Sequence, residues 1–243
     1  EMTIAWRAGA GPEVAAYQIA FILPEVLNHL AATGFLSVTF IPLFTRRRIQ
    51  QGDAEAGRVF SILLCVFGSA AALGVGIAMV FAPQLVAWSA PGLEDPEALA
   101  AAVRMTRIVL PAQVFFFAGG LLTAVQFACE HFWLPALAPL IYNLGIIAGG
   151  LLLGPWLGIE GFAWGVLAGS LGGNLLLQWV GARRLGLRFR PAWDWRHPDV
   201  GAYLRLTLPL MIGLTMTFST EFFFRFFGSY LPAGSIAVLN FGL

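Results

Sequence analysis

Long apolar stretches occupy almost the whole chain, and its charged residues are concentrated in the short gaps between them. Of the 243 residues, 58% are hydrophobic and 11% are charged, and the mean hydropathy is +0.79. A soluble domain of this length could not bury so much apolar surface, whereas a helix that crosses a bilayer needs about 20 apolar residues. The sequence therefore predicts an all-α fold, a polytopic transmembrane helical bundle.

The apolar stretches predict six complete spans and the beginning of a seventh near residue 233; the six cover residues 14–44, 59–88, 103–129, 132–156, 159–180 and 200–230. The chain starts at Glu1 without an initiator methionine and ends inside an apolar run, so we expect a fragment of a longer protein.

The charges of the loops predict an orientation. If every segment crosses the membrane once, loops 45–56 and 183–199 lie on one side, and both are rich in arginine. The opposite loops, 92–98 and 154–161, hold acidic residues and no arginine. Cytoplasmic loops carry an excess of basic residues, so loops 45–56 and 183–199 are predicted to be cytoplasmic.

The first complete span carries an unusual set of polar residues. On a continuous helix, Gln18, Glu25, His29 and Thr33 would fall within about a quarter of the circumference, with Asn28 beside them. Polar groups are costly in lipid, so this stripe should face other helices or water. A transport cavity is one interpretation; the alternative is that Glu25 and His29, four residues apart, simply pair with each other.

The sixth span also holds a charged pair. Glu221 and Arg225 are four residues apart and share a helix face. They could neutralise each other, or one of them could contact an anionic substrate or a coupling ion. Together with the polar residues of the first span, they are the candidate substrate-cavity residues.

The fifth span has a glycine at every fourth position: Gly161, Gly165, Gly169 and Gly173. Such a stripe lets a second helix approach closely, so these four residues are predicted to pack helices together.

Enzyme signatures are missing from the sequence. It contains no HExxH, CxxC or GxSxG motif, and Cys65 and Cys129 suggest neither a disulfide framework nor a metal site. We expect no enzymatic activity, no catalytic residue, no metal, no cofactor and no nucleic-acid partner.

Several segments, in their order and spacing, resemble the MurJ/MviN family of lipid II flippases in the MATE-like transporter superfamily: Arg107–Pro111, Phe132–Pro139 followed by Asn143, Gly172–Gln178 with Arg183–Arg188, Leu204–Pro209, and Ser229–Ser235. The resemblance covers essentially the whole chain.

The resemblance implies a two-lobe transporter of fourteen helices around a central cavity. This chain would run from the end of the first helix to the start of the eighth, with residues 1–199 forming most of the N-terminal lobe and residues 200–243 beginning the C-terminal lobe. The implied function is outward movement of a polyprenyl-diphosphate-linked peptidoglycan precursor (lipid II) across the bacterial cytoplasmic (inner) membrane. The implied partners are that lipid-linked saccharide and the membrane lipids, with the protein a monomer. Coupling to Na⁺, to H⁺ or to the membrane potential is left open.

The chain departs from the family pattern in the first complete span. Asn28 and His29 stand where the family has two adjacent arginines, and Thr33 stands where it has a glutamate. Arg225 matches a family arginine, although Phe224 replaces the aspartate before it. A pyrophosphate needs cationic donors, so these departures bear on the substrate.

Other functions therefore remain open. One is a flippase for another lipid-linked oligosaccharide. A second is a cation-coupled exporter of drugs or small amphiphiles, which Glu25 and Glu221 would suit as membrane carboxylates. A third is a scaffold without transport activity or a membrane enzyme, although the chain lacks catalytic loops.

Overall fold

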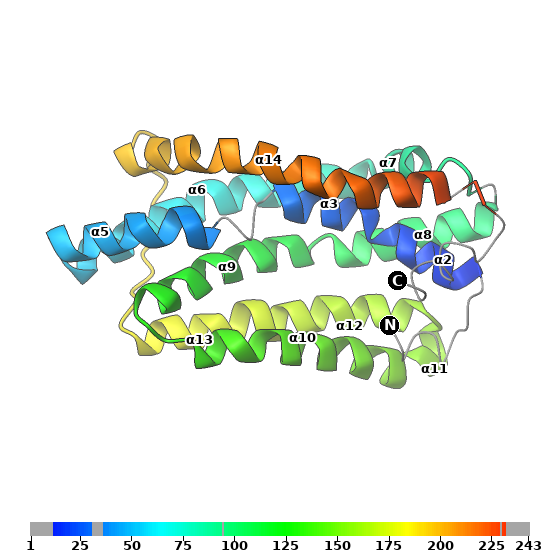
Figure 1. Cartoon of the computed structure of the whole chain (residues 1–243). Helices are drawn as coiled ribbons and strands as arrows, with labels where there is room; N and C mark the ends of the chain where they lie inside the picture. Colours follow the sequence, from blue (N-terminus) through cyan, green and yellow to red (C-terminus); the bar gives the residue numbers. More distant parts are fainter. Residues whose placement is uncertain (1–11, 31–35, 94, 229, 232–243) are drawn as a thin grey trace.

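The computed structural model describes residues 12–30, 36–93, 95–228 and 230–231, and it is a bundle of helices (Figure 1). The prediction of an all-α bundle is confirmed, because the described residues contain helices, turns and loops and no strand. In chain order the elements are α2 (Pro12–Ala20), α3 (Ile22–Leu30), the π-helical turn η1 (Leu36–Phe40), α5 (Ile41–Gln51), α6 (Asp53–Val80), α7 (Ala82–Ser89), α8 (Pro96–Val109), α9 (Ala112–Ala128), α10 (Trp133–Leu152), α11 (Gly154–Leu157), α12 (Glu160–Gly169), the π-helical segment η2 (Ser170–Leu176), α13 (Leu177–Arg184) and α14 (Pro198–Gly228).

Within the described part of the chain, three helical segments are long and apolar enough to cross a membrane: α6 (Asp53–Val80), α8 and α9 together (Pro96–Ala128), and α10 (Trp133–Leu152). The exposed face of α10 is apolar. Leu140, Leu144, Ile147 and Leu151 recur at helical spacing and are all exposed. A stripe of exposed leucine and isoleucine is stable against lipid tails, where the backbone is satisfied within the helix.

The first predicted span is not a single helix. Helix α2 ends at Ala20 and α3 begins at Ile22. Between them, the Phe21 N–H donates a hydrogen bond to the Gln18 carbonyl at 3.2 Å. Pro24 contributes to this break because it has no N–H to donate to the Ala20 carbonyl, one turn earlier. The Thr106 hydroxyl on α8 donates to that carbonyl instead, at 3.3 Å.

Prolines also divide the second and third predicted spans. Helix α6 ends at Val80 and α7 begins at Ala82, with Pro83 in its first turn. Helix α8, which begins earlier than predicted, is separated from α9 by Leu110 and Pro111. A proline fits the first turn of a helix, where its missing N–H would have no helical partner. The fourth predicted span is likewise divided, into α10 and the short helix α11.

The segment over α12, η2 and α13 packs closely against α10, and glycines line the contact. A Cβ on Gly165 would lie 2.6 Å from the Gly145 carbonyl oxygen, and one on Gly169 would lie 2.6 Å from the Tyr142 carbonyl oxygen. Gly161 faces Gly149 and Gly173 faces Ala138 at comparably short distances. Because these glycines have no side chain, the backbones of α10 and α12 come into direct contact (Figure 1).

Among the described residues, two large hydrophobic clusters join most of the other helices. One joins α2, α7, α8 and α12 around Met105 and Phe162. The other joins η1, α5, α6, α9 and the beginning of α14 around Phe40 and Phe60, whose ring centroids are 6.3 Å apart. Helix α14 also contacts α3 and η1, two of the elements that form the first predicted span.

Candidate functional site

The polar residues predicted on the first span lie on two helices. Gln18 belongs to α2 and is 9% exposed. Glu25 and Asn28 belong to α3 and are partly buried, and each interacts with at least one partner. Because the break at Phe21 separates them, Gln18 and Glu25 do not share one continuous helical face. His29 also belongs to α3, but its side chain lies outside what the structure describes, and Thr33 lies outside the described residues altogether.

Glu221 and Arg225 both belong to the long helix α14, and their side chains are outside the described part of the structure. Helix α14 packs against α3 (Figure 1). The two helices that carry most of the candidate residues are therefore neighbours.

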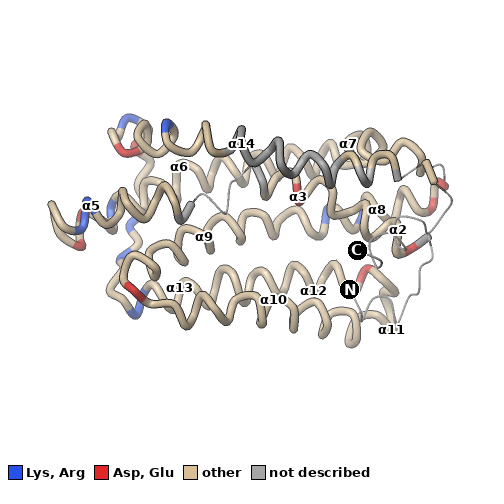
Figure 2. The backbone as a smooth tube through the Cα atoms, viewed as in Figure 1, with Lys and Arg blue, Asp and Glu red and all other residues tan. Residues whose placement is uncertain are grey.

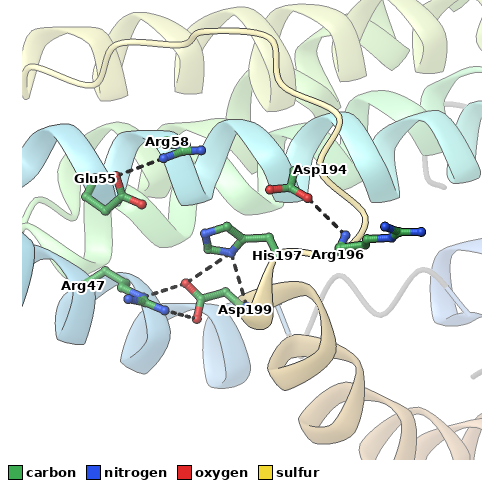
Figure 3. A network of polar contacts seen from close by, with 7 residues as sticks. All are labelled: Arg47, Glu55, Arg58, Asp194, Arg196, His197 and Asp199. Atoms are coloured by element: carbon green, nitrogen blue, oxygen red, sulfur yellow. Dashed lines mark hydrogen bonds and ion pairs between the residues drawn. The ribbon is translucent and has the colours of Figure 1, made fainter.

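Most of the arginines gather at one end of the bundle, where α5 ends and α6 and α14 begin (Figure 2). The centre of this region is Asp199, in the first turn of α14 (Figure 3). Arg47 donates from Nε to Asp199 Oδ2 at 2.7 Å and from Nη2 to Oδ1 at 2.8 Å. This hydrogen bond raises the pKa of Arg47. His197 Nδ1 accepts the Asp199 N–H at 3.3 Å and lies 3.8 Å from Asp199 Oδ2.

A polar groove of about 660 Å³ lies beside this network, between the start of α6 and loop 186–192. Arg58, Arg188 and Arg190 line it together with Asp53 and Glu55. The loop is held to α6 because the Arg190 N–H donates to Ser61 Oγ at 3.1 Å. The mixture of guanidinium and carboxylate groups makes this a solvated polar surface at the end of the bundle.

The opposite end of the bundle has its own ion pair. Arg104 on α8 donates from Nε to Glu160 Oε1 at the start of α12, at 2.8 Å. Arg107, one turn later, donates to the Met79 carbonyl at 3.1 Å. The two arginines thus join α8 to the start of α12 and to the end of α6.

Sequence reasoning missed a glutamine pair in the interior. Gln126 on α9 is 1% exposed and Gln178 on α13 is fully buried, and Gln126 Nε2 donates to Gln178 Oε1 at 2.7 Å. Gln178 Nε2 in turn lies 3.2 Å from the Gly173 carbonyl, in the π-helical segment η2. A π-helical turn leaves carbonyls without their usual helical partner, so the amide satisfies one of them. Two isolated glutamines in apolar sequence could have signalled the pair, but not which two would meet.

No group of three or more His, Cys, Asp and Glu side chains that could hold a metal ion occurs among the described residues. Apolar spans, broken helices, a close glycine seam and charges at the two ends define a multi-pass α-helical membrane protein.

Comparison with known proteins identifies the family. The family model described as "Lipid II flippase MurJ" matches residues 4–243, and the chain belongs to that family. The family consists of transporters of the bacterial inner membrane and not of enzymes. The resemblance seen in the sequence is thereby confirmed.

Individual relatives agree with this membership. The chain is 28% identical to the "Lipid II flippase MurJ" of Burkholderia cenocepacia over 248 residues, which cover 99% of this chain and 48% of the relative. It is 29% identical to the "Probable lipid II flippase MurJ" of Bdellovibrio bacteriovorus, covering 92% of this chain and 44% of the relative. The chain spans about half the length of the curated relatives it matches.

A solved structure shares the fold. The structure described as "Lipid II flippase MurJ, inward closed conformation" superposes with a TM-score of 0.79 at 22% identity, covering 98% of this chain and 49% of that one. The bundle is thus the fold of about half of that protein.

Proposed function

We propose that the protein to which this chain belongs moves lipid II, a polyprenyl-diphosphate-linked peptidoglycan precursor, across the cytoplasmic membrane. The observation that carries the proposal is the family match over residues 4–243. The chain alone covers about half of a curated relative, so the activity is assigned to the full-length protein.

The substrate cavity in this proposal is lined by Gln18, Glu25, Asn28, His29, Thr33, Glu221 and Arg225. Two features of the described residues support it. The break at Phe21 lies between Gln18 and Glu25, and broken helices at membrane depth are tolerated where they line a cavity or are buried in protein. Helix α14, which carries Glu221 and Arg225, packs against α3.

The orientation and lobe division are part of the same proposal. Segments 45–56, which is largely helical in α5 and α6, and 183–199 meet at one end of the bundle through Arg47 and Asp199. Their arginines favour the cytoplasmic side. Residues 1–199 would form most of the N-terminal lobe and residues 200–243 the start of the second lobe. The transporter would act as a monomer, driven by Na⁺, H⁺ or the membrane potential.

Complementation tests the function. The full-length protein is expressed in a bacterium depleted of its own lipid II flippase, and growth and surface exposure of lipid II are scored. We expect rescue, and we expect R225A to abolish it because a pyrophosphate requires cationic donors. The matched control is R205A, since Arg205 lies on the same helix and is exposed at its beginning. Well-expressed protein that fails to rescue would contradict the proposal.

A second candidate is a flippase for another polyprenyl-diphosphate-linked saccharide. It is favoured by Asn28 and His29 on α3, which stand where the family resemblance implies arginines. Reconstituted vesicles loaded with lipid II or with other lipid-linked saccharides distinguish the two candidates. Replacing Asn28 and His29 by arginine should shift preference toward lipid II only if the second candidate is correct. Na⁺- or H⁺-driven efflux of dyes from the same vesicles would instead identify an exporter of small amphiphiles.

A further inference from the structure

A second cavity lies inside the bundle, away from the arginine-rich end. It has a volume of about 310 Å³ and is lined by α3, α6, α9 and the first third of α14. Small residues of α6 form one wall, among them Ala70, Ala71 and Gly74. Ala70, Leu204 and Leu208 are exposed, so the cavity opens sideways between α6 and α14.

One polar atom in this cavity is unsatisfied. Gln113, in the first turn of α9, lines the cavity and is 6% exposed. Its Oε1 is buried and has no hydrogen-bond partner within the described residues. A buried acceptor left in this state costs about 1–3 kcal/mol, so native proteins rarely retain one without a purpose.

The other polar side chains of the cavity are already engaged. Thr207 Oγ1 donates to Thr39 Oγ1 at 3.3 Å, and the Tyr203 hydroxyl interacts with both of these threonines. Water alone is a poor occupant, because a buried water needs two to four polar partners and the remaining lining is almost wholly aliphatic and aromatic. The matching ligand has an apolar body and one O–H or N–H group.

We propose that this cavity binds a neutral amphiphile from the bilayer, an apolar chain carrying a single hydroxyl or amide donor, whose donor hydrogen-bonds Gln113 Oε1. The size fits, since ligand pockets begin at roughly 300 Å³ and combine apolar walls with a few polar groups. A charged headgroup does not fit, because the described lining residues include no arginine, lysine, aspartate or glutamate. None of the proposed substrate residues is among the described residues that line this cavity.

Binding of 1-dodecanol and of its methyl ether to the full-length protein in nanodiscs tests the proposal. The two probes share their chain, but only the alcohol can donate a hydrogen bond. We expect the alcohol to bind more tightly than the ether, and Q113L to weaken alcohol binding about tenfold while leaving ether binding unchanged. Q113L should also raise the melting temperature of the unliganded protein, because it removes the unsatisfied oxygen.

A substitution that fills the cavity with a larger side chain tests whether the probes bind there. A Cβ on Gly74 meets no atom within 4 Å, so G74L should extend into the cavity without a clash and block both probes. Gly76 has equally open space but does not line the cavity, so G76L is the matched control. A70L provides a second way to fill the mouth if G74L accumulates poorly. Equal affinity for the alcohol and the ether, or full alcohol binding in both G74L and A70L, would overturn the proposal.

Discussion

Arg47 on α5 and Asp199 in the first turn of α14 form a two-pronged ion pair, with N–O distances of 2.7 and 2.8 Å, across 152 residues of sequence. The Asp199 side chain is 7% exposed and that of Arg47 is 21% exposed, so the pair is largely shielded from water. It attaches the beginning of α14 to the end of α5. If α14 moves in the proposed transport cycle of the full-length protein, this contact must move with it or open.

Disrupting this pair should destabilise the protein. We expect D199N to lower the free energy of unfolding by about 2 kcal/mol, because a charge-assisted hydrogen bond is lost and Arg47 keeps its charge. R47K should retain only part of the stabilisation, since an ammonium cannot make the paired contact. The measurement is thermal unfolding in a double-mutant cycle of R47A and D199A. The control is R46A, at an exposed neighbouring position; additive effects of R47A and D199A would contradict the prediction.

The glycine seam predicts a position-specific effect of one methyl group. In G165A the new Cβ would lie 2.6 Å from the Gly145 carbonyl oxygen, so α10 and α12 must separate, at a cost of about 2 kcal/mol. In G172A the nearest atom is Ile141 Cγ2 at 3.6 Å, an ordinary contact. Melting temperatures of the two variants should therefore differ, with G172A close to the parent protein. A similar loss in both would contradict the prediction, because alanine is the better helix former at both positions and only the seam distinguishes them.

The buried glutamine pair predicts non-additivity. Q126L leaves Gln178 Oε1 without its donor, which should cost about 1–3 kcal/mol, and Q178L removes the side-chain acceptor of Gln126 Nε2. The double variant Q126L/Q178L should be more stable than the sum of the single effects implies, because both polar groups are then removed. Thermal unfolding measures all three variants. Gln84, which is exposed on α7, provides the control Q84L; equal and additive losses would argue against the pair.

The reactivity of Cys129 should depend on pH in a predictable direction. Burial raises the pKa of the Cys129 thiol, and the Arg48 guanidinium, whose Nη1 lies 3.3 Å from Sγ, partly offsets this. Because the thiolate is the nucleophile, alkylation at neutral pH should be slower than for a free thiol and should increase as pH rises through the raised pKa.

The variant R48Q should move the midpoint of the alkylation profile to still higher pH, because it removes the favourable positive charge. Iodoacetamide rates in a C65S background isolate Cys129, and R46Q is the matched control. An unchanged or lower midpoint in R48Q would contradict the assigned role of Arg48.

Sequence reasoning predicted the class of fold because hydropathy acts locally. Each apolar stretch must become a helix in lipid, whatever its neighbours are, so an all-helical bundle followed from composition and spacing. Pro24 predicts a kink in the first span, but the end of one helix at Ala20 and the break at Phe81 were not predicted. A proline permits a break, but whether the helix kinks or ends depends on groups that can satisfy the freed carbonyls, such as Thr106 for Ala20.

The candidate site was predictable only in part. Glu25 and Asn28 were identifiable because polar groups are costly in lipid, and the structure places both on α3. Gln113, by contrast, gives no signal in the sequence, since a single glutamine near a proline is ordinary. Its interest arises from what surrounds it, an apolar cavity assembled from four helices far apart in the chain.

The sequence by itself determined that this is a multi-pass helical membrane protein, and its motifs indicated the flippase family. Both follow from local order along the chain, namely the lengths of apolar runs and the spacing of prolines, glycines and charges. The tertiary structure decided which residues meet: Arg47 with Asp199, Gln126 with Gln178, and Gly165 with Gly145. Such pairings depend on how helices cross and where they break, and these geometries are set by packing among segments that lie far apart in sequence.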